Sequence, residues 1–433
     1  MLPRLRAALR SLPLILLVAL LLRAGFAWDY QAHRPHTALR ALPFLFESGN
    51  IAYSLAGGHG FGSPLRIDTG PTAWMTPVYP LLLSAIMRVF GIYTFASWVA
   101  AVTMNIGFSS ITCIPLYFAA KRVGGAGLAA GAAWLWAVFP NAVLLSFQSL
   151  WDTSLSALLV TTALWATLRI VDSARARDWT AYGLLWGLIL MTNAALLSLL
   201  PFFLGWAAWR NEKQHTALAC GIIALCCVPW TVRNYLIFHT FVPLRSTLGL
   251  QLWVGNNPAA KPVWLGENHP INDTAERLAY TKMGEIAYMA QKSHDAVRYI
   301  VTHPGHEAQL FAGRFAMLWA GGSLHPLDDF FGKTTGWFRF ILLFNLCAAA
   351  GALGGIVILF RDRSIYALPL AAGPLVFPIA YYVTLALPRY RHPIDPTLML
   401  LLALLIRQLL TKQRTTKKAA FRSGGKRPSS AAG

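Results

Sequence analysis

Long apolar runs, separated by short polar and basic segments, follow one another along most of this chain. An α-helix needs about 20 apolar residues to cross ~30 Å of hydrocarbon, and most of the runs approach or exceed that length. The expected spans are residues 12–28, 95–120, 123–139, 144–168, two short spans within 182–209, 216–237, 338–360, 365–387 and 396–410. The pattern therefore predicts an all-α integral membrane protein with about ten transmembrane helices.

Composition supports this class over a soluble or nucleic-acid-binding protein. Apolar residues make up 56% of the 433 residues and charged residues only 12%, whereas a soluble domain carries about 25% charge. The net charge of +20 does not indicate nucleic acid, because most lysines and arginines gather in short loops and one tail, as the positive-inside rule requires. The expected partner is the lipid bilayer of a bacterial-type inner (plasma) membrane, with both chain ends in the cytoplasm. The first run could also be a signal peptide, but the many later spans favour an uncleaved first helix.

Two external segments are expected to carry the function. Residues 78–91 of the first one are apolar but too few to cross the membrane, which predicts an interfacial or re-entrant helix. In the second one, residues 274–301 have apolar positions at helical spacing, which predicts one or two amphipathic helices, with another after them. The expected modules are an N-terminal transmembrane module (1–238) with a catalytic first external loop (29–94), a helical external, periplasmic cap (239–335), C-terminal transmembrane helices (336–410) and a basic, disordered cytoplasmic tail (411–433).

Asp152 is the one acidic residue predicted inside a membrane span. A carboxylate at the centre of a span costs at least about 2.5 kcal/mol, so one that persists usually faces a polar cavity. If its helix begins at Pro140, Asp152 lies roughly 18 Å in. The alternative is a helix that begins near Ser149, with Asp152 as an ordinary residue at its end.

Glu47 is the candidate acid of the first external loop. Glu47, Asn50 and Ser54 fall on one face of a short helix, which is followed by a glycine-rich turn around His59. We expect Glu47 and Asp152 to face one cavity open to the outside, with Asn50 and His59 as substrate contacts. The structural alternative is that Glu47 caps a helix or pairs with one of the arginines of its own loop, Arg34 and Arg40.

Four arginines lie at the external ends of spans, where the positive-inside rule does not place them: Arg233, Arg245, Arg389 and Arg391. Guanidinium groups bind phosphate bidentately, so such a cluster at the membrane boundary suits a lipid-linked phosphate. The alternative for each is an interfacial arginine whose stem snorkels to the surface.

The chain contains no sequence signature of a soluble enzyme, such as a P-loop, an H-E-x-x-H or a G-x-S-x-G segment. The five cysteines all lie in apolar stretches without metal spacing, so we expect free thiols. Glu47 and Asp152 could form part of a Mg²⁺ or Mn²⁺ site, but no third oxygen ligand is in view and no cofactor is certain.

Several stretches resemble the polytopic GT-C glycosyltransferases, a group that includes protein O-mannosyltransferases and aminoarabinose transferases. They are ESGNIAYSLAGGHGFGSP from Glu47, PTAWMTPVYPLLLSAIMRVFG, WDTSL around Asp152, PWTVRNYLIFHTFVPLRSTLGLQLWVGNNP and RYRHP, in family order. The resemblance implies an enzyme that takes a sugar from a polyprenyl-phosphate donor on the non-cytoplasmic face. It also implies a first-loop acid, here Glu47, and a second acid near the external end of a later span, here Asp152.

The chain departs from the family at two places. An Asp-Glu type pair is common in the first loop, but here Glu47 follows Phe46; many members carry Arg-Pro after the fifth span, where this chain has residues 191–193. The resulting hypothesis is an inverting transfer to a lipid, glycan or protein acceptor, with Glu47 as base and the arginines on the leaving phosphate. The rival is a transporter or flippase for a lipid-linked sugar or another anionic substrate, although the chain shows no internal repeat.

Overall fold

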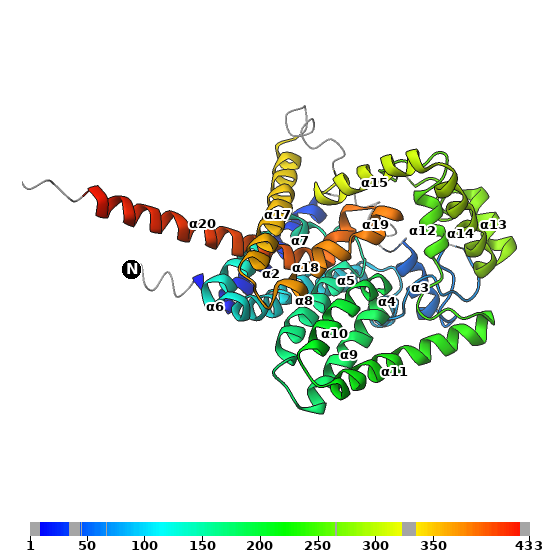
Figure 1. Ribbon diagram of the computed structural model, residues 1–433. Coiled ribbons are helices and arrows are strands. Elements are labelled where there is room, and N and C mark those ends of the chain that lie inside the picture. The colour runs from blue at the N-terminus through cyan, green and yellow to red at the C-terminus, as the bar shows by residue number, and fades with distance from the viewer. Residues whose placement is uncertain are drawn as a thin grey trace, which may run out of the picture.

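The structure is a computed structural model that describes residues 9–33, 44, 46–65, 67–264, 266–322 and 335–424, with side chains up to residue 413 (Figure 1). Over these residues the regular structure is helical, apart from one isolated bridge between Gly62 and Pro71. Arg34 and Arg40, the possible partners of Glu47, lie outside the described residues.

Six helical segments of the described chain are long and apolar enough to cross a membrane: Leu12–Ala32, Phe95–Val138, Thr153–Ile170, Lys213–Phe238, Gly336–Arg361 and Pro388–Gln413. Three shorter apolar helical segments accompany them: Val78–Phe90, Ala194–Trp209 and Ala367–Val383. The prediction of an all-helical integral membrane protein is therefore confirmed. Residues 78–90 form a helix too short to span the bilayer, in agreement with the interfacial or re-entrant helix that was expected.

The segment Phe95–Val138 is a hairpin of two packed arms. It contains α5 (Phe95–Ile111) and α6 (Cys113–Val138), and non-helical backbone at Gly124 and Gly125 divides α6. Gly125 has φ 77°, which glycine adopts without strain. Contacts between the two arms show that the chain reverses at these glycines. The Cys113 thiol approaches the Ala133 carbonyl, and the Trp136 indole N–H donates to the Ser109 carbonyl at 2.8 Å. The reversal lies beside the basic pair at residues 121–122, where the sequence predicted a loop.

The helix that follows starts later than expected. Residues 140–144 form the separate short helix α7 (Pro140–Leu144), and α8 (Thr153–Ile170) begins only after a turn-rich segment. Asp152 is therefore the residue immediately before α8 and does not lie three turns inside a span. This corrects the preferred placement and agrees with the alternative in which the helix begins late.

The next helices run α9 (Ala176–Thr192), the 3₁₀ helix η3 (Ala194–Leu199), α10 (Leu200–Trp209) and α11 (Lys213–Phe238). The helices α9 and α11 pack along each other, with Gly183 and Gly187 of α9 against Ile222 and Cys226 of α11. The absence of side chains at these two glycines allows the close approach. The sharp break between α9 and η3 falls at Asn193.

Towards the C-terminus, α17 (Gly336–Arg361) packs against α20 (Asp395–Gly424). Residues 365–387 were expected as one span, but they form α18 (Ala367–Val376) and the short α19 (Ile379–Val383), separated at Pro378 and followed by the 3₁₀ helix η4 (Pro388–Ile394). Proline removes a backbone donor, which explains the break. The tail was expected to be disordered, but α20 continues to Gly424.

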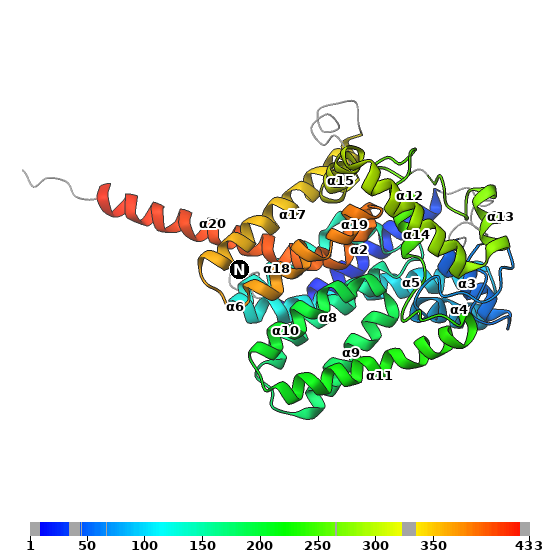
Figure 2. The ribbon, with the colours of Figure 1, turned by 45° about the vertical axis from the view of Figure 1, so that its right-hand side comes forward.

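The cap consists of α12 (Leu248–Gly255), α13 (Thr274–Met283), α14 (Glu285–Thr302) and α15 (Pro304–Trp319). The first loop forms α3 (Glu47–Ala56) and α4 (Val78–Phe90). Figure 2 shows α12, α13 and α14 on the same side of the molecule as α3 and α4, and the end of α20 projects from the opposite side. The predicted short helix at Glu47 and the amphipathic helices of the cap are thus present.

One buried carboxylate fastens the first loop to the cap. Glu285, at the start of α14, accepts hydrogen bonds from the Thr72 hydroxyl, the Ala73 N–H at 2.8 Å, the Ser246 hydroxyl at 2.7 Å and the Tyr280 hydroxyl at 2.8 Å. Four donors to one buried carboxylate satisfy its charge. This clasp holds residues 72–76 against the cap, where they line the cavity described next.

Candidate active site

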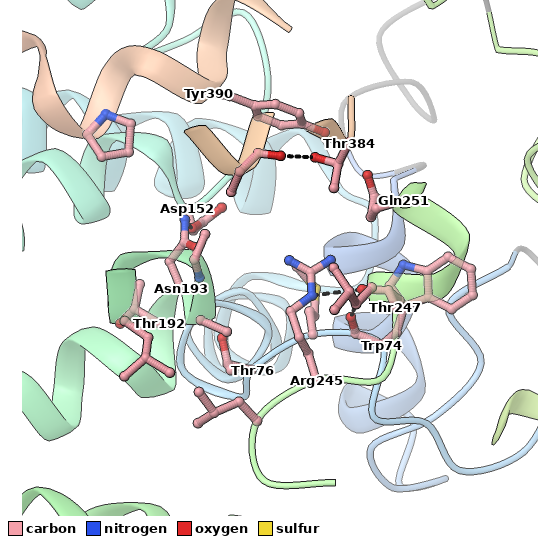
Figure 3. A pocket seen from close by; sticks show the side chains of 18 of the residues that line it. Trp74, Thr76, Asp152, Thr192, Asn193, Arg245, Thr247, Gln251, Thr384 and Tyr390 are labelled. Atoms are coloured by element: carbon pink, nitrogen blue, oxygen red, sulfur yellow. Dashed lines mark hydrogen bonds between the residues drawn. The ribbon is translucent and has the colours of Figure 1, made fainter. Parts of the chain in front are cut away.

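A cavity of about 410 Å³ opens where six segments of the chain meet (Figure 3). They are the start of α3, residues 74–76, the start of α8, the break between α9 and η3, the approach to α12, and α19 with η4. Of the residues expected to carry function, Glu47, Asp152, Arg245 and Arg389 line it. The fold therefore brings together two acids and two arginines that are far apart in sequence.

Asp152 is held in place by two neighbours. The Ser156 hydroxyl and the Asn193 side-chain amide each donate to Asp152 Oδ2 at 2.9 Å. Among the described residues no hydrogen bond reaches Oδ1, so this oxygen keeps its capacity to accept one. Arg389 and Arg245 lie close enough for their positive charges to act on the carboxylate.

Asn193 owes its place to the break after α9. Its backbone is extended (φ −148°, ψ 106°), and its side-chain oxygen accepts from the Ala195 N–H at 3.1 Å, which caps η3. The amide nitrogen of the same side chain is left to donate to Asp152 (Figure 3). A helix-capping residue thus also orients the cavity acid.

Glu47 occupies the first turn of α3, and its side chain is 13% exposed. The neighbouring Ser48 hydroxyl donates to the Leu150 carbonyl at 3.2 Å, and the Phe46 ring lies 4.7 Å from the Trp151 ring. These contacts tie the start of α3 to the segment before α8. They explain why Glu47 and Asp152 share one cavity.

A histidine of the cap faces Glu47. His269 Nε2 lies 3.6 Å from Glu47 Oε1, and the imidazole is 3% exposed. Burial lowers the pKa of His269 from its usual value, because desolvation disfavours the charged form, and the charges of Glu47 and Glu276 oppose this shift. A buried neutral imidazole therefore stands beside the first-loop acid.

The two arginines of the cavity are oriented differently. Arg245 is exposed, and its Nε donates to the Thr247 hydroxyl at 2.7 Å, so the end of its guanidinium reaches into the cavity (Figure 3). The guanidinium carbon of Arg389 stacks 3.7 Å from the centre of the Trp151 ring and 5.3 Å from that of Tyr390. Stacking fixes the plane of the Arg389 fork and leaves its N–H groups available for an anion.

Arg233 and Arg391 do not line the cavity, which corrects the predicted cluster of four. Arg233 donates to the carbonyls of Thr72 at 2.6 Å and Phe61 at 2.8 Å and stacks on Trp230. Arg391 is 1% exposed and pairs with Asp395 at 2.7 Å. Both guanidinium groups are used by the fold, because backbone carbonyls and a buried carboxylate already satisfy them.

The two predicted substrate contacts also lie away from the cavity lining. Asn50 is buried, and its amide donates to the Pro64 carbonyl at 2.8 Å, which closes the glycine-rich turn. His59 is exposed on that turn. Asn50 and Ser54 therefore hold the loop, since the Ser54 hydroxyl donates to the Gly60 carbonyl, and of the three residues on this helical face Glu47 alone lines the cavity.

Several lining residues were not singled out from the sequence, among them Trp74, Gln251, Tyr381 and Tyr390, and Asn193 was noted only as a departure from the family pattern. The rings of Tyr381 and Tyr390 stack with centres 4.8 Å apart. Trp74 lies in the PTAWMTP stretch and Tyr390 in RYRHP, so the motif positions were a usable indication. Aromatic faces beside polar groups are typical of small-molecule sites.

The donor set does not complete a divalent metal site. Within the described residues no group of three or more His, Cys, Asp or Glu side chains could hold an ion. His269, beside Glu47, accepts a hydrogen bond from the Ile271 N–H at its Nδ1, at 3.2 Å. The Nε2 atom that faces Glu47 therefore carries the proton of the neutral ring and has no lone pair for a metal. The two arginines of the same cavity are suited to bind an anion.

Comparison with known sequences gives one family. Residues 74–232 match the family described as dolichyl-phosphate-mannose-protein mannosyltransferase. No curated protein matches the chain. The family match runs from Trp74 through Asp152 into α11, and it confirms the resemblance that the sequence motifs indicated.

Solved structures with a similar fold include several of the oligosaccharyltransferase from Archaeoglobus fulgidus. The match to the apo form has a TM-score of 0.54 at 13% sequence identity, and it covers 96% of this chain and 52% of the oligosaccharyltransferase chain. The complex with an inhibitory peptide and a dolichol-phosphate has a TM-score of 0.52 at 14% identity, with 96% and 52% covered. The complex with Zn and sulfate has a TM-score of 0.52 at 16% identity, with 93% and 49% covered. The chain thus shares this fold and spans about half the length of these proteins.

Proposed function

We infer from the family match and the shared fold that the chain is a polytopic membrane glycosyltransferase of the GT-C type, and we propose that it uses a polyprenyl-phosphate-linked sugar. The sugar would pass to a hydroxyl of a lipid, glycan or protein acceptor. The observation that carries the proposal is the cavity itself, in which two carboxylates and two available guanidinium groups meet beside a membrane helix end. A base for the acceptor and cations for a phosphate leaving group are the parts that such a transfer needs.

In this proposal Glu47 is the general base. It takes the proton from the acceptor hydroxyl as that oxygen attacks the anomeric carbon of the donor. The bond between that carbon and the phosphate oxygen breaks, and its electron pair leaves with the lipid phosphate. A positioned base contributes about 10² to 10⁴ in rate. Single displacement inverts the anomeric centre.

Arg245 and Arg389 stabilise the charge that develops on the phosphate as it leaves. Their guanidinium groups keep donors free, unlike those of Arg233 and Arg391. Asp152 binds the acceptor through Oδ1, while Asn193 and Ser156 hold Oδ2. We assign no step to a divalent metal, because the donor set described above does not complete a site for one.

The proposed orientation places the cavity on the non-cytoplasmic side of a bacterial-type plasma membrane, with about ten spans. The cap and the basic end of α20 lie on opposite sides of the molecule (Figures 1 and 2). The positive-inside rule puts that basic end in the cytoplasm, which turns the cap and the cavity to the periplasm. The dolichol-phosphate bound by the archaeal oligosaccharyltransferase supports a lipid-phosphate donor for this fold.

The test uses purified protein in proteoliposomes and a panel of radiolabelled undecaprenyl-phosphate sugars. Two quantities are followed, namely sugar released from the carrier and carrier moved between leaflets. We expect release with one donor of the panel and loss of release in the Arg245→Met/Arg389→Met double variant. Movement across the bilayer without any release would contradict the transferase and favour the transporter.

A further inference from the structure

The cap places one side chain directly against the proposed base. His269 lies in the loop before α13, and the Asn272 and Asp273 N–H groups bond its backbone carbonyl at 3.0 and 2.9 Å. Its imidazole packs edge-on against Trp74 and Trp264, with ring centres 5.8 and 5.4 Å apart. The backbone bonds and the two indole rings leave the imidazole little freedom to turn.

The hydrogen bonds fix which nitrogen of His269 carries the proton. The Ile271 N–H donates to His269 Nδ1 at 3.2 Å. A backbone N–H is a donor only, so Nδ1 must be the unprotonated nitrogen. The neutral ring then carries its proton on Nε2, the nitrogen that faces Glu47 Oε1 at 3.6 Å. An imidazolium would set an N–H at Nδ1 against the Ile271 N–H.

We propose that His269 is a positioning residue for Glu47, by which the cap supplies a neutral Nε2–H that orients the carboxylate toward the acceptor. The proposal rests on the proposed function, in which Glu47 is the base. Donation to Oε1 leaves Oε2 to take the acceptor proton. The present separation exceeds a hydrogen bond, and such contacts commonly tighten when substrate binds.

The arrangement makes the base depend on the docking of the cap. His269 belongs to the cap, whereas Glu47 belongs to the first loop, and the Glu285 clasp joins the two at Thr72 and Ala73. Trp74, which packs on His269, follows directly after the clasped residues. Glu47 therefore acquires its oriented form only when the cap is seated on the first loop.

Two substitutions separate positioning from packing. His269→Gln can present an amide N–H near the position of Nε2, whereas the shorter His269→Asn cannot; both lose the aromatic ring equally. We expect the turnover number of His269→Asn to fall roughly 10- to 150-fold, the value of one charge-assisted hydrogen bond, with the donor KM unchanged. His269→Gln should recover most of the turnover. Equal losses in both variants would mean that the ring only packs.

The matched control is a second cap histidine. His294 also lies 3.6 Å from a carboxylate, that of Asp295, but its side chain is 65% exposed and does not line the cavity. His294→Asn should leave turnover unchanged. A double variant with Glu47→Gln gives the decisive cycle, because His269→Asn should cost nothing further once the base is gone. A full additional loss in that background would overturn the positioning role.

Nuclear magnetic resonance tests the contact between His269 and Glu47 without any need for enzymatic turnover. Nitrogen-15 NMR spectra of histidine-labelled protein, with the His269 signals assigned by their absence in His269→Asn, should show an unprotonated Nδ1 and a protonated Nε2. The Nε2 signal should shift in Glu47→Gln. A proton on Nδ1, or no shift, would overturn the inference. Wild-type protein that shows the expected signals but releases no sugar would refute the proposed function alone.

Discussion

The RYRHP segment places two arginines, two residues apart, in opposite environments, and this contrast gives a sharp prediction. Arg389 stacks on Trp151 in the cavity wall. Arg391 is buried with Asp395 and also donates to the Leu318 and Trp319 carbonyls at 3.1 and 3.0 Å. Replacing each by methionine keeps length and apolar volume but removes the charge. Arg389→Met should lose transfer with only a small loss of stability, and Arg391→Met should lose much more stability.

The magnitudes follow from what each change leaves behind. Arg391→Met removes the cation from a carboxylate that is 1% exposed and, among the described residues, leaves it only His392, 3.4 Å away; breaking a buried pair from one side costs about 3–5 kcal/mol. Arg389→Met loses a stacked cation worth about 0.5–2 kcal/mol. Its missing contact to the leaving phosphate, about 1.5–3 kcal/mol, should lower kcat/KM for the donor by roughly 10- to 150-fold.

The assay pairs thermal unfolding of detergent-solubilised protein with donor kcat/KM. The control is Arg391→Met/Asp395→Leu, in which removing both charges should restore most of the stability, because no unpaired ion remains. The reasoning would be refuted if Arg391→Met unfolded at the wild-type temperature, or if Arg389→Met and Arg391→Met lost transfer equally at equal stability.

Three further outcomes are expected. Asn193→Leu removes a donor to Asp152, so acceptor KM should rise about 10-fold in steady-state assays, and an unchanged KM would separate Asp152 from the acceptor. Glu285→Gln weakens the two hydrogen bonds from Thr72 and Ala73 that hold the first loop on the cap, together with two bonds within the cap, so limited proteolysis should cut the cap faster than in wild type, and equal rates would count against the clasp. Burial lowers the pKa of His269, so on acidification the unfolded chain takes up a proton at this residue before the folded chain does, and the contribution of His269 to stability is complete above about pH 6.5 and is lost as the pH falls below it. The melting temperature of His269→Gln should therefore drop less on acidification than that of wild type. Parallel curves of melting temperature against pH would contradict the buried neutral ring.

Hydropathy located the long helices well. The expected spans at 12–28, 216–237 and 338–360 became Leu12–Ala32, Lys213–Phe238 and Gly336–Arg361. In lipid, apolar length alone decides whether a helix can span, so such runs are read reliably.

Hydropathy failed where an apolar run bends. Residues 144–168 and 365–387 are mainly apolar, and their hydropathy is the same whether the backbone forms one helix or two. The break at Pro378 follows from the proline itself. The turn before Asp152 depends instead on contacts with a distant segment, such as the Ser48 bond to the Leu150 carbonyl. A single sequence does not reveal those contacts.

The candidate site was predictable in its acids and only partly in its arginines. Glu47 and Asp152 stood out because carboxylates are rare in this chain. Arg245 and Arg391 are both arginines predicted at the external end of a span, yet Arg245 reaches the cavity whereas Arg391 forms a buried ion pair with Asp395. Asn193 was noted only as a departure from the family's Arg-Pro, although its break in the helix is what orients Asp152.

The most direct test of the central claim is a single-turnover transfer in proteoliposomes with the donor identified from the panel. Wild type is compared with Glu47→Gln, and with Glu267→Gln at an exposed cap position as the control. The account predicts that Glu47→Gln binds donor as wild type does but transfers its sugar about 10² to 10⁴ times more slowly, while Glu267→Gln is unaffected. Transfer at the wild-type rate by Glu47→Gln would contradict the assignment of the base and of the cavity as the active site.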